Sequence, residues 1–346
     1  MMRRNVFGAW LSLAVLVFGA ATFAGAQTRR GAAARQPVRA AQAGAVVPLP
    51  ASDAVMLVDM RRLINEAMPR VLANDAAKLA AVNADIDEFK TTTGIDARSF
   101  DRVALGARFT NPSPDVTKID HVVGVAHGTF NEAAILAAVR LKSSAAREEK
   151  LAGKTIHIFT LDEQVKFFGV TPRMRVRDLA VTALDANTLV VGEPEAVRAT
   201  VNAAGGRGRI SPELVGLARQ NASAIIGFGA NIPASVLKKV EGFGSEEVEQ
   251  SVASIRQIYG SLAMTPNGYD VLTTLRAATA ADAQRLAQTI TALKPLGSFA
   301  ASQLSGDKRQ LALRALDSLK INAQGTDVQL KLDFTQADIA TMLRVF

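Results

Sequence analysis

The sequence predicts an α+β protein in which two tandem, similar units each combine a mostly antiparallel sheet with helices packed on one face. Three observations support this prediction. Short apolar runs are paired across tight turns, apolar residues recur at helical spacing between them, and the order of these elements occurs twice. With 49% hydrophobic and 21% charged residues, the composition is typical of a globular chain.

The N-terminus has the features of an export signal. Arg3 and Arg4 precede an apolar run over residues 6–23, and Ala24-Gly25-Ala26 follows with small residues where signal peptidase requires them. We therefore expect residues 1–26 to be a signal peptide and the protein to be periplasmic or secreted. The alternative is an inner-membrane protein anchored by an uncleaved segment 6–23.

Residues 27–50 are expected to form a disordered basic linker, because this stretch is rich in Ala, Gly, Gln and Pro and has no sustained period. It holds Arg29, Arg30, Arg35 and Arg39 and no acid. Without residues 1–50 the chain has 34 basic and 32 acidic residues, a balance that argues against nucleic-acid binding. Membrane contact is expected only through the N-terminal segment.

The first unit, residues 51–209, opens with an apolar run at 54–59 that is typical of a buried strand. Two helical stretches are expected after it, at 60–73 and 75–93. Pro69 should kink or divide the first of them, since proline lacks the amide proton that a helix interior needs.

The helix at 75–93 carries one apolar stripe, formed by Leu79, Val82, Ile86 and Phe89. Gly94 is expected to end it in a left-handed conformation. The other elements expected in this unit are strands at 101–110 and 118–128, a helix at 130–139 capped by Thr129 or Asn131, a strand at 154–160, a hairpin of strands 178–185 and 188–192, and a helix at 194–204.

The second unit, residues 210–346, follows the same order. Thr279 and Asp282 resemble a capping box at the start of its long helix. The elements expected here are a strand at 222–229, helices at 233–240 and 245–255, strands at 256–264 and 269–277 around Pro266-Asn267-Gly268, a helix at 279–294, strands at 318–323 and 327–334, and a helix at 335–345.

Five pairs of positions align the two units: Val55 with Ile225, Leu105 with Leu262, Val123 with Val271, Val181 with Ile321, and Val190 with Leu330. Their separation shrinks from 170 to 140 residues, as loop deletions in the second unit would produce. The alternative is a chance similarity of ordinary α+β patterns. The sequence leaves open whether the two sheets join edge to edge or pack as separate domains.

This layout is similar to families of uncharacterised bacterial envelope proteins, which are exported, duplicated α+β chains. The features that carry the resemblance are architectural: Ala24-Gly25-Ala26, the helix exit Thr92-Thr93-Gly94-Ile95-Asp96, and the strand–helix junctions Gly128-Thr129-Phe130 and Ala278-Thr279-Ala280. The resemblance implies a fold and a location, and it brings no active-site residue.

Gly205-Gly206-Arg207-Gly208-Arg209 could cradle an anion through its backbone amides, and the alternative is a mobile loop between the two units. The cluster most suggestive of a binding site is an arginine ridge. Arg173, Arg175 and Arg177 project from one face if residues 171–178 are extended, and such a ridge can bind phosphate or carboxylate groups. The alternative is that these charges protect an edge strand from pairing with another sheet.

Other motifs predict no catalytic or metal site. The chain has no cysteine, three histidines and no Gly-x-Ser-x-Gly elbow. His121 and His127 are expected on one strand face but too far apart to share a metal. Gly227-Phe228-Gly229 lacks the third glycine of a dinucleotide loop, and Asp85, Asp87 and Glu88 fit a solvated helix face.

We therefore expect an exported, non-catalytic binding or scaffolding module of the bacterial envelope that needs no cofactor. Its partner would be an envelope protein or an amphiphilic ligand. The two alternatives are a lipid or amphiphile carrier with a cavity between sheet and helices, and a metal-free hydrolase. The sequence favours a role other than catalysis and does not identify the ligand.

Overall fold

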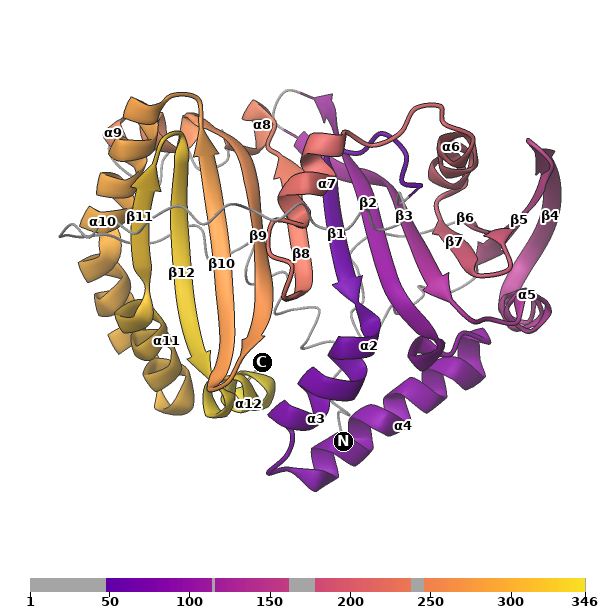
Figure 1. The fold of residues 1–346 in the computed structure, drawn as a ribbon, viewed down its shortest axis with the longest axis horizontal. Helices are drawn as coiled ribbons and strands as arrows, with labels where there is room; N and C mark the ends of the chain where they lie inside the picture. Colours follow the sequence, from indigo (N-terminus) through magenta and orange to yellow (C-terminus); the bar gives the residue numbers. More distant parts are fainter. Residues whose placement is uncertain (1–47, 114–115, 162–177, 238–245, 346) are drawn as a thin grey trace.

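The computed structural model describes residues 48–113, 116–161, 178–237 and 246–345. Their strands form one antiparallel sheet in the order β11-β12-β10-β9-β8-β1-β2-β3-β7-β6-β5-β4 (Figure 1). Helices pack on this sheet, so the predicted α+β class and its antiparallel pairing are confirmed.

The strands are β1 (Ala54–Asp59), β2 (Phe100–Ser113), β3 (Val116–Gly128), β4 (Ser143–Leu151), β5 (Lys154–Leu161), β6 (Asp178–Asp185), β7 (Thr188–Gly192), β8 (Ala224–Asn231), β9 (Ile255–Thr265), β10 (Gly268–Ala277), β11 (Lys320–Gln324) and β12 (Asp327–Thr335). The two edges of the sheet are β11 and β4.

The helical elements are α2 (Met60–Arg62), the π-helical turn η2 (Leu63–Ala67), α3 (Met68–Val71), α4 (Ala76–Thr93), the 3-10 turn η3 (Ala97–Ser99), α5 (Glu132–Arg140), α6 (Pro194–Ala204), α7 (Pro212–Ala218), α8 (Ala234–Leu237), α9 (Glu246–Ala253), α10 (Ala280–Ser302), α11 (Gly306–Ser318) and α12 (Gln336–Val345).

The first and second halves of the chain meet at the centre of the sheet. There β1 pairs antiparallel with β8, and Leu57 lies opposite Gly227. Outward from this contact, one side runs β1-β2-β3-β7-β6 and the other runs β8-β9-β10-β12-β11. The sheets of the two halves therefore join edge to edge, which the sequence left open. The β4–β5 hairpin lies beyond β6.

Helices lie on both faces of the sheet, so the prediction of helices on one face only was wrong, and the two faces are covered differently. On the face of Val55 and Leu57, which we call the α7 face, α6 and α7 cover strands of the first half and the centre. The opposite face, called the α4 face, carries α4 and α5 in the first half and α9, α10 and α12 in the second. Apolar side chains alternate between these faces along each central strand, as a sheet covered on both sides requires.

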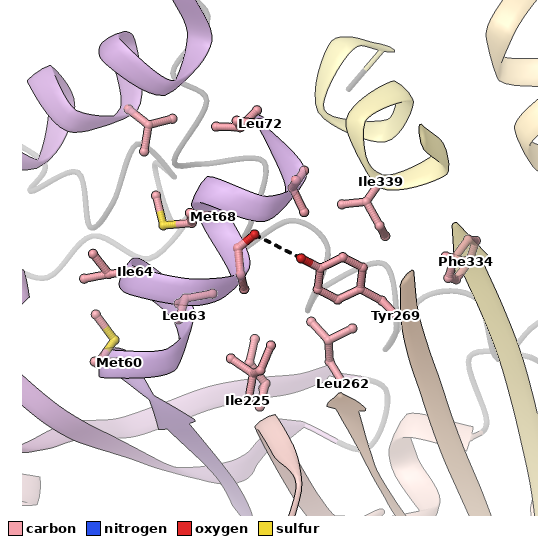
Figure 2. Close-up of a cluster of buried hydrophobic side chains, with 14 of the residues drawn as sticks. Met60, Leu63, Ile64, Met68, Leu72, Ile225, Leu262, Tyr269, Phe334 and Ile339 are labelled. Atoms are coloured by element: carbon pink, nitrogen blue, oxygen red, sulfur yellow. Dashed lines mark hydrogen bonds between the residues drawn. The ribbon is translucent and has the colours of Figure 1, made fainter. Parts of the chain in front are cut away.

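One core cluster on the α4 face ties the two halves together (Figure 2). Side chains of α2, η2 and α3, including Met60, Leu63 and Met68, pack against Leu262 and Tyr269 of the second half. The Tyr269 side chain points from β10 toward the helices, and its hydroxyl donates a hydrogen bond to the Ala67 carbonyl over 2.9 Å. Consecutive helices after β1 are thus fixed to strands about 200 residues later in the chain.

The predicted helix ends are confirmed where their signals are local. Gly94 has φ of 70° and ends α4, and Val82 and Ile86 of the predicted stripe are buried. Asn131, one of the two expected caps, accepts a hydrogen bond from the Ala134 amide at the start of α5. Thr279 accepts one from the Asp282 amide at the start of α10.

The strand β4 and the helices α7 and α11 were not expected, and α10 is much longer than expected. β4 has exposed residues along most of its length and the sequence SSAAREEKL, so it lacks the apolar alternation that marks a half-buried strand. The helices α7 and α11 were also missed. α10 continues past Lys294 to Ser302, with Pro295 inside it, so the expected end at the proline was wrong.

Candidate functional site

Beyond α7, the α7 face of the second half carries polar side chains on four neighbouring strands. In Figure 1 no helix crosses β10 and β12 on this side of the sheet. Alternation places Val328 and Leu330 of β12 in the core on the other side. We call the following residues the polar face: Gln257, Tyr259, Ser261, Asp270, Thr274, Arg276, Lys320, Asn322, Gln324, Asp327, Gln329, Lys331 and Asp333.

The first network on the polar face centres on Arg276. Its Nε donates to Oδ1 of Asp327 over 2.8 Å, and its Nη2 lies 3.3 Å from Oδ2 of the same carboxylate. The Tyr259 hydroxyl donates to that Oδ2 over 2.8 Å, and the Arg276 guanidinium lies 5.2 Å from the centroid of the Tyr259 ring. Three strands thus contribute one hydrogen-bonded, charge-balanced cluster.

This network continues toward α7. Nη1 of Arg276 donates to Oε1 of Gln257 over 3.0 Å and lies 3.5 Å from the Glu213 carboxylate. The Gln257 amide in turn donates to Oδ1 of Asn231 over 2.9 Å. Glu213 stands on α7, which packs over β8 and β9, so this helix supplies one wall of the cluster.

The network keeps Tyr259 protonated. Burial, and then the hydrogen bond to Asp327, raise the pKa of the Tyr259 phenol to about 12. The hydrogen bond to Asp327 also raises the pKa of the Arg276 guanidinium. The raised pKa values extend the range in which the tyrosine is a hydrogen-bond donor and the arginine a cation to alkaline pH.

A second network lies further along β10 and β12. Nζ of Lys331 is 2.8 Å from Asp270 and 3.2 Å from Asp333, and Nζ of Lys320 is 2.8 Å from Asp333. The hydrogen bond that Lys331 donates to Asp270 raises the pKa of Lys331, and the hydrogen bond donated by Lys320 lowers the pKa of Asp333. These residues are partly exposed, so the network presents both signs of charge to solvent.

Between the two networks, Thr274 is buried without a hydrogen-bond partner. Thr274 is 1% exposed. Among the described residues, its Oγ1 is the one buried side-chain nitrogen or oxygen atom without a hydrogen-bond partner. By register Thr274 lies between Tyr259 and Gln329. Such an unpaired hydroxyl costs about 1–3 kcal/mol.

The corresponding region of the first half is covered. There α6 packs on the α7 face over β3, β7, β6 and β5. Its Arg198 makes a bidentate pair with Glu149 of β4, with distances of 2.7 and 2.8 Å. In the second half the helix after β12, α12, packs on the α4 face instead, as the burial of Ile339 with Tyr269 and Phe334 shows. Among the helices that the structure describes, none takes the place of α6 on the polar face.

The predicted arginine ridge cannot be compared with this face, since Arg173, Arg175 and Arg177 lie outside the described residues. The polar face itself was not recognised in the sequence. Its signal is the alternation of Asp327, Gln329, Lys331 and Asp333 with apolar residues along β12, which indicates a strand with one polar side.

His121 and His157 each lie beside a different glutamate. His121 has a positive φ of 53° at an irregularity in the β2–β3 register, which interrupts the simple alternation behind the same-face expectation. Its Nδ1 lies 3.6 Å from Glu195, and Nδ1 of His157 lies 3.1 Å from Glu148. Across the described ranges, no three His, Asp or Glu side chains are grouped so that they could hold a metal ion.

The glycine motifs have packing roles. A Cβ on Gly227 would overlap the carbonyl oxygen of Ala218, so this glycine allows α7 to lie directly on β8. The loop that contains Gly208 is held against the start of the described chain, because the Ala51 amide donates to the Gly208 carbonyl over 2.7 Å. In the predicted acidic helix cluster, Asp87 pairs with Arg98.

None of the helices that the structure describes is both long enough and apolar enough to cross a membrane. The segment 6–23, expected as a signal or anchor, and residues 27–47 of the expected linker lie outside the described residues. The end of the linker was predicted wrongly, because Leu49 is fully buried in the core and Pro50 bridges to Arg209.

Comparison with known proteins gives neither a family nor a curated relative: no family model and no curated protein matches the chain. Among solved structures the chain is similar to crystal forms of TP0453. Form III has a TM-score of 0.44 at 10% identity, and form I has 0.41 at 10%; each covers 87% of this chain and 98% of that chain. Form IV has 0.40 at 12% identity, covering 85% and 93%. At these values the likeness has no functional implication.

Fold and site together define an α+β protein built on one antiparallel sheet, with a polar face that none of the described helices covers. The charges on that face are already paired with one another, and its tyrosine is a donor. Toward solvent the face presents the partly exposed second network and the exposed amides of Asn322 and Gln324.

Proposed function

We propose that this chain is a non-catalytic binding module of the bacterial envelope, and that the polar face is where its partner binds. The observation that carries the proposal is the hydrogen-bonded cluster of Tyr259, Arg276 and Asp327 on a sheet face that no described helix covers. Such a rigid array of fixed donors and acceptors suits a polar protein surface, since its geometry is set before the partner arrives.

The same cluster favours binding over hydrolysis. A general base must be free to accept a proton near neutral pH, whereas Tyr259 keeps its proton up to a pKa of about 12. The carboxylates of Asp327 and Asp333 are engaged by Arg276 and by lysines. Within the described residues, the polar face thus supplies recognition chemistry.

We also propose that the halves 51–209 and 210–346 arose by duplication. The mirrored strand order on the two sides of the β1–β8 contact supports this proposal. So does the pairing of Leu57 with Gly227. These residues are 170 positions apart, which is the separation that the sequence alignment of the two units gives for their first strands. Under this proposal, the first half keeps α6 on its α7 face, and the second half has lost the equivalent helix. This loss would free the polar face for a partner.

Export is the part of the proposal with the simplest test. Cell fractionation should place the protein in the periplasm or the medium, with an intact mass that begins at Gln27. Because Trp10 is the only tryptophan, the mature protein should show no tryptophan emission. Cytoplasmic protein with a full-length mass would overturn the proposed location.

Binding at the polar face can be tested by site-specific photocrosslinking in cells. A photoreactive residue at the outward-facing position Asn322 should give a protein adduct, whereas one at exposed Gln310 on α11 should not. Lys331→Glu should abolish the Asn322 adduct by reversing a central charge. A folded, exported protein without an adduct at Asn322 would contradict the proposal, and a lipid adduct there would identify an amphiphile instead.

A further inference from the structure

The second half of α10 exposes apolar side chains on its outer side. Leu296 is 59% exposed, Phe299 67% and Leu304, just beyond the helix, 43%. We call the apolar residues of this region that reach solvent the outer stripe: Ala292, Pro295, Leu296, Phe299, Ala300 and Leu304. Within α10 they recur at spacings of three and four, so they lie along one side of the helix.

The inner side of the same helix is already buried. Ala283, Leu286 and Ile290 of α10 pack against β10 and β12, and Gly297 and Ala301 are buried nearer its end. The first half of α10 has an ordinary outer side, with exposed Gln284, Arg285 and polar Gln288. Only the second half is apolar on both sides, which is typical of a helix that is covered on both.

The charges around the outer stripe are predominantly basic. Residues 283–306 contain no acid. Lys294 lies within this stretch, and its Nζ is 3.5 Å from a backbone carbonyl, that of Leu319. Beyond Leu304, exposed Lys308 and Arg309 follow Asp307 at the start of α11. An apolar stripe with a basic rim is the pattern of a helix that lies in the interface of an anionic bilayer.

We propose that the outer stripe docks on an anionic lipid surface, with Leu296 and Phe299 inserted among the lipids and the basic rim against the headgroups. This contact is independent of the polar face and adds membrane association to the proposed binding role. It differs from the sequence expectation, which limited membrane contact to the N-terminal segment.

The test is co-sedimentation of the mature protein, residues 27–346, with vesicles. The wild type should bind vesicles of equal phosphatidylglycerol and phosphatidylcholine and bind pure phosphatidylcholine more weakly. The double variant Leu296→Ser/Phe299→Ser should lower the partition coefficient by about tenfold or more. The matched control Gln284→Ser/Gln288→Ser, on the polar half of α10, should bind like the wild type. Urea unfolding checks that each variant folds.

Two further arms distinguish the outer stripe from the basic linker and from self-association. In a background where Arg29, Arg30, Arg35 and Arg39 are alanine, the Leu296→Ser/Phe299→Ser effect should persist; if it vanishes, the linker makes the contact and the proposal is wrong. Sedimentation velocity without lipid should show no concentration-dependent association. Wild type that self-associates through the outer stripe and ignores vesicles would assign the stripe to a second copy and overturn the lipid proposal.

Discussion

The Tyr269 hydroxyl and the Ala67 carbonyl, 202 residues apart in sequence, are joined by a buried hydrogen bond of 2.9 Å. Tyr269 is 1% exposed and Ala67 is fully buried. Ala67 ends the π-helical turn η2, just before α3 with its proline at position 69. The second half of the sheet thus stabilises an irregular helix that follows the first strand.

Removing this hydroxyl should destabilise the fold without removing the ring. In Tyr269→Phe the Ala67 carbonyl loses the partner that Tyr269 supplies, and we expect the free energy of unfolding to fall by about 1–2 kcal/mol. Urea unfolding followed by circular dichroism measures the change. Tyr269→Leu, which also removes ring packing, should cost more, and a Tyr269→Phe protein as stable as wild type would show that the bond contributes nothing.

The two tyrosines of the chain should ionise only at extreme pH. Burial first of all raises the pKa of both Tyr259 and Tyr269 from 10.0 to about 12. Ultraviolet titration near 295 nm should therefore show almost no phenolate at pH 10.5 in the folded protein and the ordinary transition near 10 in urea. Substantial phenolate absorbance at pH 10.5 before unfolding would contradict this assignment.

The same shifts make stability fall at alkaline pH. Because the folded pKa values are raised, the unfolded chain releases these protons first. Their contribution is complete below pH 10 and is lost as pH rises through about 12. The expected slope in this window is roughly 1.4 kcal/mol per pH unit for each tyrosine. Tyr269→Phe should remove the contribution of one tyrosine from this slope.

Much of the fold could be predicted because its signals are local. The α4 stripe, the Gly94 exit and the Asn131 cap depend on residues within a turn of one another, and the structure has all of them. Tight hairpins such as β9–β10 were equally visible. β4 was missed because an exposed edge strand has no apolar side to reveal it.

The polar face depends on distant residues, so its assembly was not visible in the sequence. Tyr259, Arg276 and Asp327 meet only because β9, β10 and β12 are neighbours in one register. Each is an ordinary residue in its own segment. That no described helix covers this face depends on where α12 packs, and nothing in the pattern of α12 says on which face of the sheet it lies.

The Arg276 cluster should matter more for stability than the outer ion pairs of the same face. Asp327→Ala removes the acceptor of both Arg276 and Tyr259, and we expect a loss of about 1–3 kcal/mol. The control Lys320→Ala breaks a pair whose side chains are 69% and 40% exposed, and should cost less than about 1 kcal/mol.

A double-mutant cycle isolates the pair itself. Combining Asp327→Ala with Arg276→Met in urea unfolding should give a coupling of about 1–3 kcal/mol, since the two residues share a bidentate contact. If Asp327→Ala and Lys320→Ala cost the same small amount, the cluster is an ordinary surface network and its role as a rigid binding array loses its basis.

The contact between α7 and β8 sets one border of the polar face, and two glycines test it in opposite directions. Gly227→Ala would bring a Cβ against the Ala218 carbonyl, so α7 must move away from the strand. We expect a loss of about 1–3 kcal/mol, typical of overpacking. Gly216, on α7 itself, has open space where an added Cβ would lie. Gly216→Ala should therefore be neutral or stabilising by up to about 1 kcal/mol through helix propensity.

The same two variants test whether α7 borders the binding surface. Because Glu213 lies on α7, Gly227→Ala should also lower the Asn322 crosslinking yield, while Gly216→Ala should leave it unchanged. Equal stability and equal crosslinking in both variants would mean that α7 does not border the binding surface.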